Sequence, residues 1–161
     1  MANKRINPRH IVVDKRNVNL DAIVDEAMKD DMLHAWLVIG KVLKEQEQLG
    51  LEEIKELRNS IKEINASEGN IRYAERLMGR KERPHVSLDD VSTAADLKKL
   101  KTNMEKLALH TAMCSICLGL HENRFSEERL RRIFRAVDDV QAKIENGEES
   151  YEELERQFNV E

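Results

Sequence analysis

The sequence predicts an all-α protein: a single-domain helical bundle of six or seven helices. Three observations lead to this fold class. Charged residues make up 36% of the 161 residues and aromatic residues only 4%, a composition typical of helical proteins. Two prolines and six glycines interrupt the chain sparsely. Apolar residues recur at spacings of three and four along most of the chain, as they do on the buried face of a helix.

The chain divides into an N-terminal arm and one helical domain. Residues 1–18 lack helical periodicity and are predicted to form a basic arm, and residues 19–161 are predicted to form the domain. Apolar stripes and the turn residues between them place the helices. The expected helices are 20–48, 51–65, 71–80, 93–121, 127–145 and a last short helix that begins near Tyr151.

The two longest of these helices are expected to make the core. Trp36, Leu37 and Val38 make the middle of helix 20–48 apolar on nearly all sides, so this part should lie centrally. Ser87 is expected to cap the start of the helical segment that follows it, because a serine side chain accepts hydrogen bonds from free backbone N–H groups.

The two halves of the chain share a pattern of apolar residues. An offset of 76 residues places Met28 on Met104 and His34 on His110, and it superimposes the apolar positions that follow. We therefore hypothesise two duplicated helical hairpins, with 20–65 and 96–145 as the candidate repeat halves. This hypothesis proposes an architecture and no chemistry.

Two histidines and two cysteines lie on one stripe of helix 93–121: His110, Cys114, Cys117 and His121. These residue types bind zinc, but a helix rises about 1.5 Å per residue, so only two neighbours on the stripe can share an ion. Free cysteines are also among the most buried residues. No metal site and no cofactor are predicted, and whether the stripe is core, interface or metal site stays open.

Basic residues gather in two places although the net charge is −4. Arg72, Arg76 and Arg80 fall on one helix face, and Lys81 and Arg83 follow. These five are the predicted binding surface for an acidic partner, and the basic arm adds Lys4, Arg5 and Arg9. Charge reversal at Arg76 and Arg80 is expected to abolish partner binding and to leave the melting temperature nearly unchanged.

The arginines of helix 127–145 are given a different interpretation. Arg131, Arg132 and Arg135 each lie four residues from an acid, so the helix is expected to neutralise itself. The expected pairs are Glu127–Arg131, Glu128–Arg132 and Arg135–Asp139.

Several classes of protein lack support in this sequence. No apolar run approaches the roughly 18–20 residues of a membrane span, and no apolar segment follows the basic N-terminus as in a secretory signal. The two cysteines do not make a disulfide framework, and a cytoplasmic location is expected. The sequence contains no phosphate-binding loop, dinucleotide glycine motif, nucleophile elbow or zinc-protease motif, so no catalytic residues are predicted.

The C-terminal third carries a turn-and-cap motif: Leu120-His121-Glu122-Asn123-Arg124-Phe125-Ser126-Glu127-Glu128-Arg129-Leu130. A helix, Gly147 and a final acidic helix follow. This arrangement resembles the ends of small all-α proteins of phages and prophages of Gram-positive bacteria, although those have a glycine where this chain has Ser126. The resemblance implies a phage accessory protein and brings no catalytic residues.

Together these observations predict a non-enzymatic, phage-encoded accessory protein that binds and modulates a host or phage macromolecule. An inhibitor of a bacterial defence system is one concrete form. A protein is the expected partner, nucleic acid and a homodimer are left open, and no membrane is expected. Two alternatives remain: a nucleic-acid-binding regulatory protein, and an all-α protein that binds or hydrolyses nucleotides. The second would use acids such as Glu52, Glu53 and Asp89 to hold Mg²⁺.

Overall fold

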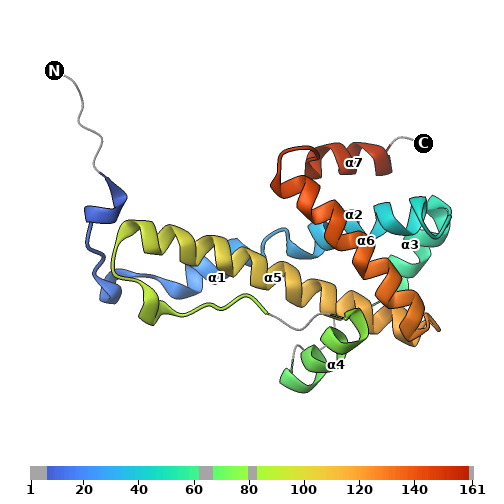
Figure 1. Cartoon of the computed structure of the whole chain (residues 1–161), viewed down its shortest axis with the longest axis horizontal. Coiled ribbons are helices and arrows are strands. Elements are labelled where there is room, and N and C mark those ends of the chain that lie inside the picture. Colours follow the sequence, from blue (N-terminus) through green and yellow to red (C-terminus); the bar gives the residue numbers. More distant parts are fainter. Residues whose placement is uncertain (1–6, 62–66, 80–82, 160–161) are drawn as a thin grey trace. The chain divides into compact units, whose positions relative to one another are not determined.

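The protein is an all-α helical bundle, as the sequence predicts (Figure 1). The computed structural model describes residues 7–61, 67–79 and 83–159. Its α-helices are α1 (Leu20–Met28), α2 (Asp31–Glu45), α3 (Leu51–Ser60), α4 (Glu68–Met78), α5 (Ala94–Glu122), α6 (Glu127–Glu145) and α7 (Tyr151–Asn159). Short 3-10 turns lie at Pro8–His10, Lys15–Asn17 and Leu88–Asp90. Within the described ranges the only extended pairing is one isolated bridge between Val12 and Thr93.

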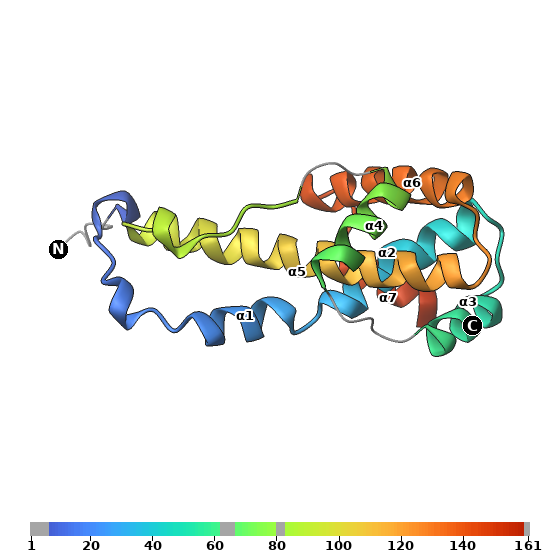
Figure 2. The same ribbon diagram turned by 90° about the horizontal axis from the view of Figure 1, so that it is seen from below.

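The chain forms two compact units. The described part of unit 1 comprises residues 7–31 and 83–110, and that of unit 2 comprises 32–61, 67–79 and 111–159. Helix α5 begins in unit 1 and ends in unit 2. In unit 1, α1 runs in the same direction as the N-terminal half of α5 (Figure 2). The described part of the predicted arm, residues 7–18, belongs to unit 1.

The prediction of one continuous helix over 20–48 was wrong, because the chain turns at Lys29 and Asp30 between α1 and α2. The last turn of α1 tightens, and the Lys29 N–H donates to the carbonyl of Glu26. Two consecutive aspartates follow, and aspartate is unfavourable inside a helix but favourable in its first turn. Asp31 occupies the first turn of α2. Helix α5 continues through the corresponding positions, so this break is not repeated in the second candidate half, and the duplication stays a prediction.

Local caps explain the other helix starts. Helix α4 begins at Glu68 instead of the expected residue 71, because the Ser67 hydroxyl accepts from the Asn70 N–H at 3.3 Å. Ser87 caps the 3-10 turn Leu88–Asp90 and not the long helix. Helix α5 starts with a reciprocal cap in which the Asp96 N–H donates to Thr93 Oγ1 and the Thr93 N–H donates to Asp96 Oδ2.

Unit 2 has a large buried apolar core. Its fully buried side chains include Ile39, Leu43, Leu120 and Phe134. The predicted central position of Trp36, Leu37 and Val38 is confirmed, since they are 6%, 6% and 0% exposed. Because protein interiors are close-packed, such a core responds to small changes of side-chain volume.

Two glycines let elements of unit 2 approach closely. A Cβ on Gly40 of α2 would lie 2.6 Å from the tip of Phe158 in α7. A Cβ on Gly119 of α5 would lie 2.3 Å from a methyl carbon of Ile61. Any larger residue at these positions would force the neighbouring side chain away.

Candidate functional site

Two of the five residues of the predicted basic surface, Arg72 and Arg76, lie on α4. Arg72 and Arg76 are exposed on one face of this helix. Arg72 is neutralised locally, because its Nε donates to Glu68 Oε1 at 3.0 Å. The Arg76 guanidinium lies 5.2 Å from the centre of the Tyr73 ring and pairs with no acid among the described residues. Arg76 is therefore the cation of this face that is available to a partner.

Tyr73 is held in place by α5 and by the turn that follows it. Its hydroxyl lies 3.3 Å from Nε2 of His121, and Nδ1 of His121 lies 3.2 Å from the backbone oxygen of Phe125. A carbonyl oxygen only accepts, so Nδ1 carries a proton, and in the neutral ring the Tyr73 hydroxyl donates to Nε2. The exposed Tyr73 ring and the guanidinium beside it thus form a fixed pair, a combination that is common at binding hot spots.

The other predicted binding residues lie outside the described residues or in unit 1. Lys4, Arg5, Arg80 and Lys81 lie outside the described residues. Arg9 is exposed in the first 3-10 turn of unit 1. Arg83 belongs to unit 1 as well, and it already has an interaction partner.

The arginines of α6 are paired differently from the prediction. The Glu127–Arg131 pair is confirmed, with 3.0 Å between Arg131 Nη2 and Glu127 Oε1. Arg132 instead reaches Glu47 at 3.0 Å, and Arg129 reaches the same carboxylate at 3.3 Å. Arg135 makes no ion pair with a described residue, so the predicted Glu128–Arg132 and Arg135–Asp139 pairs were wrong. The cause is tertiary: the turn after α2 places the Glu47 side chain, which is 10% exposed, against α6.

The histidine and cysteine stripe of α5 is largely buried. His110, Cys114 and Cys117 are 5%, 2% and 0% exposed. The Cys117 thiol points at the backbone oxygen of Ala74 at 3.9 Å, so here the stripe serves the packing of α4 on α5. No group of three or more histidine, cysteine or acidic side chains in the described ranges is placed to hold a metal ion. The acids considered for Mg²⁺ lie in different units, Glu52 and Glu53 in unit 2 and Asp89 in unit 1.

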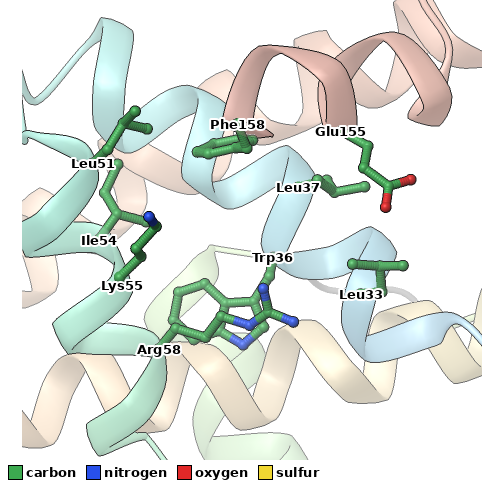
Figure 3. A pocket seen from close by; sticks show the side chains of 9 residues that line it. All are labelled: Leu33, Trp36, Leu37, Leu51, Ile54, Lys55, Arg58, Glu155 and Phe158. Carbon is green, nitrogen blue, oxygen red and sulfur yellow. The ribbon is translucent and has the colours of Figure 1, made fainter. Parts of the chain in front are cut away.

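A pocket of about 160 Å³ lies in unit 2 between α2, α3 and α7 (Figure 3). Sequence reasoning missed this pocket, because it placed the same apolar residues in a closed core. The lining residues are Leu33, Trp36 and Leu37 of α2, Leu51, Ile54, Lys55 and Arg58 of α3, and Glu155 and Phe158 of α7.

Helical spacing explains why these side chains converge. Leu33, Trp36 and Leu37 follow one face of α2 at spacings of three and four. The lining residues of α3 are also spaced by three and four residues along one helix face. They run from Leu51, which directly follows the N-cap Gly50, to Arg58 two turns later. Gly40 then admits the ring of Phe158, which brings α7 to the third side. The three helices thereby surround an apolar space with polar ends.

The charges of the pocket come from α3 and α7. Lys55 lies 3.8 Å from Glu52 of its own helix. The Arg58 guanidinium is exposed and has no ion-pair or hydrogen-bond partner among the described residues. Glu155 contributes the single carboxylate of the lining. An apolar cavity of about 150 Å³ is large enough for benzene, so this pocket has room for one apolar side chain.

Comparisons with protein-family models, curated proteins and solved structures give no match for this chain. Among the helices of the described ranges, none has the length and apolar content that a membrane span requires.

Proposed function

We propose that this chain is a non-enzymatic, phage-encoded accessory protein that binds another protein in the host cytoplasm and modulates its activity. Inhibition of a bacterial defence system is the concrete form of this proposal. The observation that supports it best is the pocket between α2, α3 and α7, an apolar cavity with the unpaired cation of Arg58 at its edge.

The chemistry of the lining specifies the segment that would bind. The pocket accepts one leucine or phenylalanine side chain among Trp36, Ile54 and Phe158. The cations of Lys55 and Arg58 favour an aspartate or glutamate beside that anchor. Few interface residues carry most of the binding energy, and they are typically apolar or aromatic anchors seated in such pockets. Arg76 on α4 provides a further cation for an acidic partner.

The test compares affinity capture from a lysate of a Gram-positive host with three forms of the tagged protein. They are the wild type, Arg58→Glu, and Arg135→Glu as the matched control, because Arg135 is also an exposed, unpaired arginine of unit 2. The partner is a protein that the wild type and Arg135→Glu retain and Arg58→Glu loses. A peptide from that partner should then change the fluorescence of Trp36, the sole tryptophan of the chain.

Two results would contradict the proposal. The first is the same set of captured proteins for the wild type and for Arg58→Glu. The second is a captured partner whose acidic, leucine- or phenylalanine-containing peptides leave Trp36 fluorescence unchanged at saturating concentration.

A second candidate function is nucleic-acid binding by α4. The exposed Tyr73 ring, stacked with Arg76, favours it, because unpaired bases stack on aromatic rings and on guanidinium groups. Affinity for single-stranded DNA or RNA would then fall steeply with salt and with Tyr73→Ala, and it would not respond to Arg58→Glu. Absence of measurable binding at 50 mM salt removes this candidate.

A further inference from the structure

Unit 1 contains two helices of opposite charge. On α1 the exposed acids are Asp21, Asp25 and Glu26, and the turn that follows α1 adds Asp30 and one cation, Lys29. On the N-terminal half of α5 the exposed lysines are Lys98, Lys99, Lys101 and Lys106, against Glu105. None of these ten side chains makes an ion pair with any described residue of its own chain. The opposite charges of the two helices are therefore not used within one copy.

Apolar side chains beside these charges are incompletely covered. On α1, Met28 is 53% exposed, and it lies three residues after Asp25 and seven after Asp21, on the same face. On α5, Lys101 lies between Leu97 and Met104, which are only half-buried. Each helix thus presents a strip in which apolar residues adjoin charges of one sign.

We propose that this surface joins two copies of the chain: α1 of each copy packs against the N-terminal half of α5 in the other. A purely acidic partner would satisfy only α5, and a purely basic partner only α1. A second copy supplies both signs at once, because a two-fold interface repeats each contact reciprocally. Asp21 and Asp25 then face Lys98 and Lys101 of the second copy, and the apolar strips meet beside them.

This inference is independent of the proposed function, because the pocket and Arg76 lie in unit 2. It predicts a dimer whose dissociation is promoted by salt, since exposed charge pairs are screened. The molar mass of the full chain is measured by light scattering after gel filtration, at several protein and salt concentrations.

Charge reversal on each helix tests the pairing directly. Variant A carries Asp21→Lys and Asp25→Lys, and variant B carries Lys98→Glu and Lys101→Glu. Each variant alone places like charges across the interface, so each should have the mass of a monomer, 18.7 kDa for the wild-type chain. An equimolar mixture restores opposite charges at both contacts and should recover the dimer mass.

The matched control is Glu26→Lys with Asp30→Lys, the same change of charge outside the proposed interface, because Glu26 is rotated by about 100° or more around α1 from Asp21 and Asp25 and Asp30 lies in the turn after α1. This control should remain a dimer, and circular dichroism should show all variants helical. A monomeric wild type at high concentration and low salt overturns the inference. Dimers of A or B alone, a monomeric control, or a mixture that stays monomeric would overturn it too, because each contradicts this pairing.

Discussion

The two units of the molecule differ in how they bury apolar side chains. All twelve of the largest fully buried side chains, among them Ile39, Met113 and Phe134, belong to unit 2. In unit 1 the buried positions are Ala27, Val91, Leu100, Ala108 and His110. Unit 1 also exposes Ile11, Val12, Leu20 and Met28, each by 39% or more.

Similar helical sequence patterns have thus led to cores of unequal size in the two units. Local stability follows buried apolar contacts, so unit 1 should open at lower free energy than unit 2. The inferred pairing of two copies would cover Met28, the most exposed of these side chains on α1. In contrast, the pocket and the α4 face belong to unit 2, whose larger buried core suits the binding role proposed for them.

The largest expected effect comes from truncating the two cores. Phe134→Ala should lower the free energy of unfolding of the chain by about 3–5 kcal/mol, because a fully buried ring is replaced by a cavity. Leu100→Ala in unit 1 should cost about 2 kcal/mol, since the half-covered surroundings can collapse or admit water.

Urea unfolding and amide hydrogen exchange measure these two changes. Leu100→Ala should accelerate exchange in unit 1 and leave protection in unit 2 nearly unaltered. Equal losses of stability, with protection lowered throughout, would show that the two units unfold together and do not differ in local stability.

A change of pH is expected to have an intermediate effect on stability. Low pH should destabilise unit 1, and high pH should destabilise unit 2. In unit 1, hydrogen bonds from Ser92 and Thr93 lower the pKa of Asp96, and those from Arg16 lower the pKa of Asp14. A lowered folded-state pKa gives stability that is present above the ordinary value of 3.8 and is lost as the pH falls through the folded-state pKa. Acid should therefore loosen unit 1.

Alkali should instead loosen unit 2. Burial disfavours the charge of Lys41, but Glu149 at 2.5 Å and Glu45 outweigh this and raise its pKa above 10.5. Burial, helped by Glu145, raises the pKa of Tyr151 above 10.0. Stability from these groups is present below those ordinary values and is lost as the pH rises through the folded-state pKa values.

The measurement for both ends of the scale is unfolding by urea between pH 2 and pH 12, followed by circular dichroism and by Trp36 fluorescence, which reports unit 2. Lys41→Met should flatten the alkaline limb, and Asp96→Asn should flatten the acid limb. An alkaline limb that is unaltered by Lys41→Met would contradict the assignment.

The smallest effect on stability is expected from the predicted binding arginines. Arg76→Glu in unit 2 should weaken partner binding about tenfold, equivalent to about 1.4 kcal/mol, and should alter the free energy of unfolding by less than about 0.5 kcal/mol. Arg9→Glu in unit 1 is the matched comparison, since it makes the same change on an exposed residue. Calorimetric titration with the captured partner measures the affinity of each variant. Equal losses of affinity in Arg76→Glu and Arg9→Glu would mean that both units contribute to the binding surface.

The sequence by itself determined the fold class and most helix ends, because periodicity and caps are local properties. Helix α6 has its predicted bounds, since Ser126 caps it and the glycine after it ends the apolar stripe. The break at Lys29 and Asp30 was missed, because its apolar flanks continue the helical spacing on both sides.

Which charges pair and where the pocket lies depend on how the helices pack, and this could not be predicted from the sequence. Glu47 pairs with Arg129 and takes Arg132 from its expected partner Glu128, although it is more than 80 residues away in sequence. The pocket depends on the convergence of α2, α3 and α7, and on the missing side chain of Gly40 that admits Phe158. Spacing along the chain specifies which residues share a helix face, but the packing of helices determines what that face meets.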